Sequence, residues 1–266
     1  MSELFFVKLG GSLITDKSKP FTARHDVINR IALEIHEARE EKKMKLVVAH
    51  GGGSFPHTIA EKFGTHKGIL NVHSYRGMAE VQDAAARLNR IIIESLLKAG
   101  ENAISISPSS CMLSEDSLIT EFYTKPLEEM LKHNLIPLAY GDLSLDLKRG
   151  CATISTEKIL GFLAKKLKPN KIILAGSTDG VFTSDPHLNK DAELIKEITP
   201  NNFDEVKKYL KGSHATDVTG GMLHKIEILV ELAKLGVESQ IINGLREGNL
   251  KDALLGNGKI GSIVKA

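Results

Sequence analysis

The chain lacks a charge imbalance and any long hydrophobic run. Its 266 residues carry 35 lysines and arginines against 33 aspartates and glutamates, which gives a formal net charge of +2. Because this charge is so small, we expect neither nucleic acid nor a membrane surface as a partner, and any positive field must be local. No apolar stretch is long enough to span a membrane.

Cysteine is scarce, since the chain carries only Cys111 and Cys151, and their separation matches no metal-binding pattern. We expect both to be free thiols in a reducing compartment. The N-terminus, "MSELFFVKLGG", has no basic region, and its apolar run is too short for a signal peptide. These absences predict a soluble, cytoplasmic protein, and its length is sufficient to bury a sizeable core.

Three common motifs of nucleotide-binding and hydrolytic enzymes are also missing. There is no G-x-x-x-x-G-K-[ST], which excludes a P-loop enzyme. The loop "HGGGSFPH" fails the dinucleotide fingerprint G-x-G-x-x-G, because Pro56 stands at the third required glycine. Its spacing also differs from that of a G-x-S-x-G nucleophile elbow, so a serine hydrolase is not expected. The histidines between residues 50 and 73 match no zinc-ligand pattern, and we expect no metal site on the protein.

Short apolar runs alternate with longer segments in which apolar residues recur at helical spacing. The runs are continuous rather than alternating, which is typical of strands buried on both faces. This order predicts an α/β protein, a three-layer α/β/α sandwich with a mainly parallel central sheet. A polar stretch near residue 145 marks the expected division of a single domain into an N-terminal lobe (1–145) and a C-terminal lobe (146–266). The strand-like runs are "LFFVKLGGS", "KLVVAHGGG", "AISISPSS", "LIPLAYGDL", "KIILAGSTDG" and "SQIINGL".

Five glycine-containing stretches follow the predicted strands or open a predicted helix. Ligands of such sheets bind at the carboxyl ends of the strands, where glycines expose backbone N–H groups and lysines add positive charge. Each stretch alone is also consistent with a tight turn, and His50 is consistent with a structural role. Together, the five stretches predict a polyphosphate site. They are "VKLGGSLITDK" with Lys8, Gly10, Gly11, Ser12 and Lys17, "HGGGSFPH", "YGD" with Gly141 and Asp142, "GSTDGVF" with Asp179 and Gly180, and "TDVTGGMLHK" with Asp217, Gly220, Gly221 and Lys225.

In this order the stretches resemble the amino acid kinase superfamily, and within it most closely the isopentenyl phosphate kinases of the archaeal-type mevalonate pathway. The similarity covers the chain from Phe6 to about Val264. Its most specific feature is His57, because kinases acting on phosphate or phosphonate groups have this histidine and relatives acting on amino-acid carboxylates generally lack it. The resemblance implies the amino acid kinase fold, transfer of the ATP γ-phosphoryl group to isopentenyl phosphate, Mg²⁺ carried by the ATP phosphates, and a homodimer formed through N-terminal helices such as "NRIIIESLL".

The resemblance also implies roles for individual residues. His57 would hydrogen-bond the acceptor phosphate, whose oxygen is already ionised near neutral pH and needs no strong general base. Glu157 would replace the acid that orients two lysines. The expected catalytic residues are Lys8, Lys17, His57, Glu157 and Lys225. The expected ATP-binding residues are Lys8, Gly10, Gly11, Ser12, Gly53, Asp179, Gly180, Gly221 and Lys225, and the expected acceptor-binding residues are Gly52, Gly53, His57 and Gly141.

The sequence departs from the family pattern at three places. Pro56 replaces the glycine before the loop histidine, "STEK" at residues 155–158 replaces "SGDD", and the stretch 176–182 has lost one acid. Two alternatives therefore stay open: a kinase for another small phosphate or phosphonate acceptor, as in the fosfomycin kinases, and a non-catalytic nucleotide sensor. The tail of the acceptor is expected against a helix after the glycine loop, with candidate contacts Tyr75, Met78, Val81 and Ala85.

Overall fold

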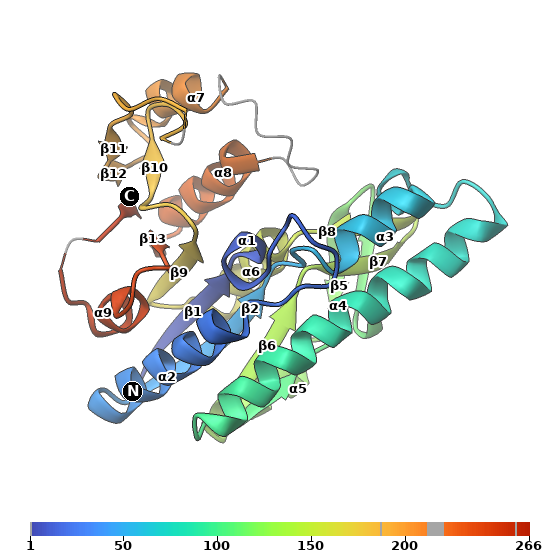
Figure 1. The fold of residues 1–266 in the computed structure, drawn as a ribbon, viewed down its shortest axis with the longest axis horizontal. Helices are drawn as coiled ribbons and strands as arrows, with labels where there is room; N and C mark the ends of the chain where they lie inside the picture. The colour runs from blue at the N-terminus through green and yellow to red at the C-terminus, as the bar shows by residue number, and fades with distance from the viewer. Residues whose placement is uncertain (1, 187, 212–220, 259) are drawn as a thin grey trace.

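Alternating strands and helices build a three-layer molecule in the computed structural model, which describes residues 2–186, 188–211, 221–258 and 260–266 (Figure 1). The middle layer is an eight-stranded sheet in the order β12-β14-β13-β9-β1-β2-β6-β3. Every neighbouring pair in it is parallel except β13 and β14, which confirms the prediction of a mainly parallel sheet. Its strands are β1 (Glu3–Leu9), β2 (Met44–His50), β3 (Ala103–Ser105), β6 (Ile136–Tyr140), β9 (Lys171–Gly176), β12 (Glu197–Ile198), β13 (Glu238–Asn243) and β14 (Ser262–Val264).

Helices cover both faces of this sheet. Successive residues of β1 divide between two hydrophobic clusters, because side chains alternate across a strand. Phe5 and Val7 pack with one set of helices and Phe6 with the other, so the first strand connects both layers. The first set is α1 (Gly11–Ile14), α2 (His25–Glu41), α4 (Val72–Lys98) and α9 (Asn249–Leu255); the second is α5 (Lys125–Lys132), α6 (Thr156–Leu167), α7 (Phe203–Lys211) and α8 (Gly221–Lys234).

Smaller elements lie outside the main sheet, and the sequence did not predict them. Four strands form a second sheet in the order β5-β4-β7-β8, and two form a hairpin. Residue 145, the expected division between lobes, lies inside β7. These strands are short and mix polar with apolar residues, as in "DLSLD" of β7, so they lack the continuous apolar runs that marked the others. They are β4 (Met112–Glu115), β5 (Leu118–Phe122), β7 (Asp142–Asp146), β8 (Gly150–Ile154), β10 (Val181–Phe182) and β11 (Leu194–Ile195); the remaining helices are α3 (Pro56–Phe63), η1 (Thr65–Lys67) and η2 (Pro108–Ser110).

The position of β1 determines where a ligand can bind. It lies between β2 and β9. The strands up to β6 lie on one side of it in the sheet, and the strands from β9 onward lie on the other. Such a switch point opens a crevice at the carboxyl ends of the strands, and the glycine-rich stretches follow these ends. Within the described ranges, no helix has both the length and the apolar character to cross a bilayer.

Candidate active site

The carboxyl ends of the parallel strands surround a cavity of about 320 Å³, a volume within the roughly 300–1,000 Å³ of typical small-molecule sites. Its walls are the turns after β1, β2, β6 and β9 and the first turns of α3, α6 and α8. Residues from distant parts of the chain therefore meet at one place. The expected site residues in its lining are Lys8, Gly10, Gly11, Ser12, Lys17, Gly52, Gly53, His57, Gly141, Glu157, Gly221 and Lys225.

The glycine loops after β1 and β2 pack directly on each other. A Cβ atom on Gly11 would lie 2.6 Å from the amide nitrogen of Gly53, too close for any side chain. Gly53 also has a φ of +56°, in the left-handed region that favours glycine. Thr15 joins the loops, because its hydroxyl donates to the Gly11 carbonyl at 2.7 Å and accepts from the Ser54 amide at 3.0 Å. This close packing lines the cavity with backbone rather than side chains.

Two lysines and one carboxylate form the charged centre of the cavity. The Lys8 ammonium at the end of β1 donates to the Glu157 carboxylate in the first turn of α6, and both residues are only 7% exposed. Lys225, from the first turns of α8, approaches the same carboxylate with an Nζ–Oε1 distance of 3.9 Å. Burial raises the pKa of Glu157, but the two ammonium groups outweigh burial, so the pKa lies below its ordinary value. Glu157 therefore stays ionised and orients both lysines.

The other "STEK" residues have separate contacts. Ser155 caps α6 by accepting from the Lys158 amide at 3.3 Å. The Thr156 hydroxyl donates to the His50 carbonyl at 2.8 Å, and the Gly141 amide donates to the same oxygen at 3.0 Å. Thr156 thus ties the helix that carries the acid to the glycine loop. The Lys158 ammonium donates to the Ser117 carbonyl at 2.9 Å, on the small sheet, and Lys158 is absent from the described cavity lining.

Pro56 and His57 open helix α3 rather than ending the loop before it. Pro56 occupies the first helical turn, where a missing N–H leaves no intrahelical bond unmade. Its ring lies against Gly52, since a Cβ atom on Gly52 would come within 2.3 Å of the Pro56 Cγ atom. His57 follows on the same turn, half-buried at the cavity wall. Lys17 reaches the cavity from an exposed turn after α1.

His50 is fully buried beneath the glycine loop. One ring nitrogen, Nδ1, lies 3.0 Å from the Gly51 carbonyl, and the other, Nε2, lies 3.2 Å from the Asn89 amide group. The ring stacks on Tyr140 at a centroid distance of 5.5 Å. Burial lowers the pKa of His50 to about 4, so the imidazole is neutral at pH 7. These contacts give His50 a structural position under the loop.

Asp179 and Gly180 lie outside the described cavity lining, whereas their neighbours Ser177 and Thr178 belong to it. The Asp179 carboxylate accepts hydrogen bonds from Asn243 at 3.1 Å and from Arg246 at 2.6 Å. Its contacts are therefore with protein groups. The expected stretch before α8 contains Asp217 and Gly220, which lie outside the described residues.

Sequence reasoning did not assign roles to several lining residues. Asp142 follows Gly141 and is 3% exposed; burial raises the pKa of this carboxyl above its ordinary value. Of the expected contacts of the acceptor tail, Val81 lines the cavity from α4, while Ala85 is buried in the same helix. Tyr75 is 63% exposed and is absent from the described lining. The strand-end position of Asp142 was the available signal. No local signal marked Thr156 and Ser177, because their contacts are with residues far away in the sequence.

Comparison with known proteins gives consistent results over the whole chain. Residues 3–243 match the model of the amino acid kinase family. The chain is 38% identical over 262 residues to an isopentenyl phosphate kinase of Methanocaldococcus jannaschii, in an alignment that covers 95% of each chain. A crystal structure of isopentenyl phosphate kinase superposes with a TM-score of 0.83 at 31% identity, covering 98% of this chain and 99% of the other. A substrate complex of isopentenyl phosphate kinase has a TM-score of 0.80 at 26% identity, covering 98% and 100%.

The buried His50 makes stability depend on pH in a predictable direction. Its folded pKa of about 4 lies below the ordinary value of 6.5, so between these values the unfolded chain binds a proton that the folded chain does not. The contribution of neutral His50 to the free energy of unfolding is then fully present above pH 6.5. It falls as the pH approaches 4, by about 3 kcal/mol in total.

Unfolding by urea at several pH values would measure this effect. The variant His50→Gln keeps a polar side chain but cannot titrate. It should be less stable than the wild type at pH 7, and the gap should narrow as the pH falls from 6.5 to 4. Parallel stability curves for the two proteins over this window would contradict a neutral, buried His50.

Proposed function

The chain belongs to the amino acid kinase family, and from this membership we propose that it phosphorylates isopentenyl phosphate with ATP, giving isopentenyl diphosphate and ADP. The observation that carries the proposal is the similarity to isopentenyl phosphate kinases along the whole chain, including 38% identity to the M. jannaschii protein. The geometry of the cavity supports the chemistry independently. It joins glycine backbone, three lysines and a histidine within one lining, as a site for two phosphorylated reactants requires.

Phosphoryl transfer asks the protein for positioning and charge neutralisation more than for covalent help. Both reactants are anions here, so their repulsion must be overcome before in-line attack. We propose that Lys8, Lys17 and Lys225 stabilise the transferring phosphoryl group from different sides of the cavity. Lys8 and Lys225 are suited to this role because Glu157 holds both in place. The cluster keeps an excess of positive charge, which is complementary to phosphate.

The glycine loops supply the second part of the mechanism. Backbone N–H groups at Gly11 and Ser12 would contact the β- and γ-phosphates of ATP, and Gly221 would contact ATP from the opposite side. Gly10 would border the phosphates without donating to them, because its amide donates to the Ala175 carbonyl at 2.8 Å. Gly52 and Gly53 would separate donor and acceptor phosphates. Because Gly11 and Gly53 pack at van der Waals contact, the two loops keep a constant separation. That separation supports a proposed distance between donor and acceptor that does not depend on side-chain rotamers.

We propose that His57 recognises the acceptor phosphate. Gly141 would border the acceptor without donating to it, because its amide donates to the His50 carbonyl. His57 lies on the side of the cavity formed by α3, near the apolar wall that includes Val81. Its role would be hydrogen bonding rather than proton abstraction, since the attacking phosphate oxygen is already ionised. The apolar wall would accept a short hydrocarbon tail.

Mg²⁺ is proposed to enter with ATP rather than at a protein site. Among the described lining residues, the carboxylates are those of Asp142 and Glu157, and Glu157 is engaged with two lysines. Residues 2–186, 188–211, 221–258 and 260–266 contain no group of three acidic, cysteine or histidine side chains that could hold a metal ion. When bound to the phosphates, Mg²⁺ would neutralise further charge.

The remaining expectations stay proposals. Residues 1–145 would carry the acceptor side and residues 146–266 the nucleotide side, in a cytoplasmic enzyme. A homodimer is proposed from the family, although the run 89–97 of α4 buries Ile92, Ile93 and Leu96 in the chain's own core, with Leu97 52% exposed. The mass of the protein in solution would test this assembly, and a monomer would contradict it.

A coupled assay of ADP release tests the proposed function. We expect release with ATP, Mg²⁺ and isopentenyl phosphate at a rate within the roughly 1–100 s⁻¹ of typical kinases. Fosfomycin and buffer alone serve as parallel acceptors and should give no comparable release. Faster release with fosfomycin would identify a phosphonate acceptor instead. Binding of ATP in calorimetry without release on any acceptor would favour a nucleotide sensor.

The variant His57→Ala tests the division of labour within the cavity. Loss of a hydrogen bond to a charged phosphate should lower kcat/KM for isopentenyl phosphate by roughly 10- to 100-fold. ATP affinity, measured by calorimetry without acceptor, should stay nearly unchanged. His73→Ala is the control, because His73 is exposed in α4 and absent from the described lining. An equal loss of ATP affinity in His57→Ala would show that the histidine is not an acceptor-side group.

A further inference from the structure

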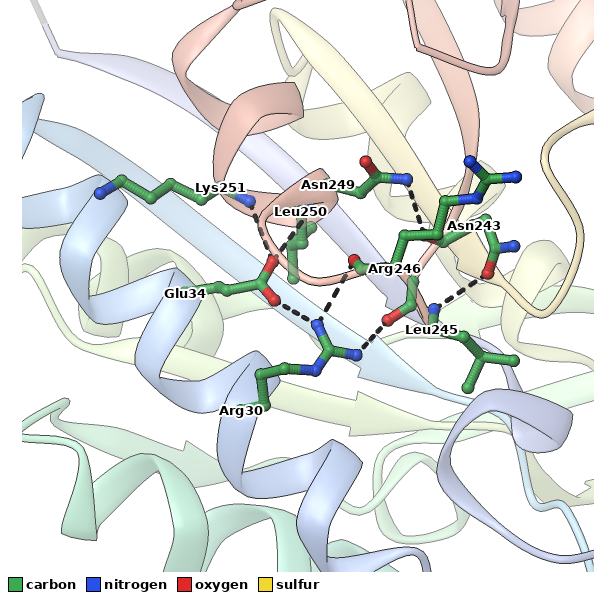
Figure 2. A network of polar contacts seen from close by, with 9 residues as sticks. Arg30, Glu34, Asn243, Leu245, Arg246, Asn249, Leu250 and Lys251 are labelled. Carbon is green, nitrogen blue, oxygen red and sulfur yellow. Dashed lines mark hydrogen bonds and ion pairs between the residues drawn. The ribbon is translucent and has the colours of Figure 1, made fainter.

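Arg30 of helix α2 reaches across the protein to the chain segment that follows β13 (Figure 2). Its guanidinium donates to the Gly244 carbonyl at 2.5 Å and to the Arg246 carbonyl at 3.5 Å. The same group pairs with the carboxylate of Glu34, one helical turn further along α2. Arg30 thus binds two carbonyls of a single turn, residues 244–248, while its own orientation is held by its helix neighbour.

Glu34 holds the other end of this turn. It is 5% exposed, and its second oxygen accepts from the backbone amides of Leu250 at 3.0 Å and Lys251 at 3.3 Å. These amides belong to the start of α9. Figure 2 shows the guanidinium and the carboxylate side by side under the turn, each directed at different backbone groups. Together they connect α2 to both ends of the 244–248 turn.

The 244–248 turn also contacts the end of β9, which lies beside the cavity. The Gly244 amide donates to the Gly176 carbonyl at 2.9 Å. Asn243 and Arg246 donate to the two oxygens of Asp179, at 3.1 Å and 2.6 Å. Three hydrogen bonds therefore join the 244–248 turn and its preceding strand residue to the segment 176–180.

This second segment is part of the cavity wall. Gly176, Ser177 and Thr178 line the cavity, and the Ser177 hydroxyl lies 3.3 Å from that of Ser12 in the first glycine loop. A continuous set of contacts thus runs from Arg30 through the 244–248 turn to the wall. The turn has little freedom to shift, because a Cβ atom on Gly244 would lie 2.6 Å from a methyl carbon of Leu13.

The contacts differ in how strongly they can hold the wall. The Arg246–Asp179 ion pair is partly exposed, with side chains 64% and 38% accessible, and exposed pairs contribute little. The Arg30 side chain is 22% exposed and that of Glu34 is 7% exposed. Their charge-assisted bonds to backbone groups are stronger. A planar guanidinium also fits two carbonyls and a carboxylate at once, which a lysine does not.

We propose that Arg30 is a positioning residue for the nucleotide, holding the segment 176–180 in place through the 244–248 turn. Asp179 then anchors this segment through Asn243 and Arg246. The inference rests on the proposed function, in that ATP would occupy the side of the cavity bounded by residues 176–178. It adds that recognition on this side depends on a residue of α2 that is absent from the described cavity lining.

The variant Arg30→Met keeps a long apolar side chain and removes the guanidinium group. We expect the dissociation constant for ADP, measured by calorimetry, and the KM for ATP to rise about tenfold, because a displaced wall weakens contact with the bound group. The KM for isopentenyl phosphate should change by less than about twofold, since the hydrogen bonds of this turn, among the described residues, go to α2, β13, the segment 176–180 and α9 and not to the expected acceptor side. Arg30→Lys should give an intermediate rise.

Arg39→Met is the matched control on the same helix. Arg39 pairs with Glu101 and donates to Asn134 at 2.8 Å, and its side chain is 10% exposed. This substitution removes a comparable buried pair at the far end of α2, so it should lower the melting temperature without changing ADP affinity. If both variants weaken ADP binding equally, or if folded Arg30→Met binds ADP like the wild type, the inference is wrong.

Arg246→Ala extends the test to an exposed side chain whose loss should not prevent folding. Because the Arg246–Asp179 pair is partly exposed, its loss should weaken ADP binding by less than Arg30→Met does, about twofold, with unchanged KM for the acceptor. An unchanged ADP affinity in this variant would contradict the proposed route through Asp179. The proposed function would fail separately, through a wild-type protein that binds ADP but does not release it from ATP with isopentenyl phosphate.

Discussion

The site depends on keeping two ammonium groups, those of Lys8 and Lys225, around the buried carboxylate of Glu157. Burying Lys8 and Glu157 costs free energy unless each is paired, and their contact offsets this cost. Glu157 stands in the first turn of α6, where the positive end of the helix dipole also favours its ionised form. The ends of β1, α6 and α8 must therefore meet within a few ångströms. The two hydrophobic clusters and the strand order of the main sheet hold these ends together.

In the proposed function, phosphate recognition would belong mainly to the backbone, and discrimination between acceptors to side chains at the edge of the cavity. The packed pair Gly11 and Gly53 tolerates no Cβ atom, so it would treat any phosphate alike. Differences between acceptors would have to arise around it, from His57, from the ring of Pro56 against Gly52, and from the apolar wall at Val81. Exchange of these few residues could change the acceptor without altering the charged centre.

Much of this site could be predicted from the sequence, because glycines and lysines at strand ends have local causes. Lys8 lies near the end of a recognisable strand, Gly11 follows that strand, and the cavity lies where parallel strands end. Thr156 could not be interpreted this way, since its partner His50 is 106 residues away. The "STEK" departure had suggested a weakened site, but Glu157 still reaches both lysines. The motif also could not show that Asp179 accepts hydrogen bonds from Asn243 and Arg246, which lie more than 60 residues further along the chain.

The pairing of β1 with β9 has a consequence for how the chain folds. β1 cannot pair with β9 until the chain has been synthesised beyond Lys171. Arg30 cannot bind the Gly244 carbonyl until a further segment has followed, because Gly244 lies 214 residues after Arg30. Closing such long loops is slow, because the chain loses entropy before the contact forms. During synthesis, β1, β2 and β6 can pair while the last hundred or so residues are still emerging. The wall at residues 176–180 is complete only when nearly the whole chain has left the ribosome.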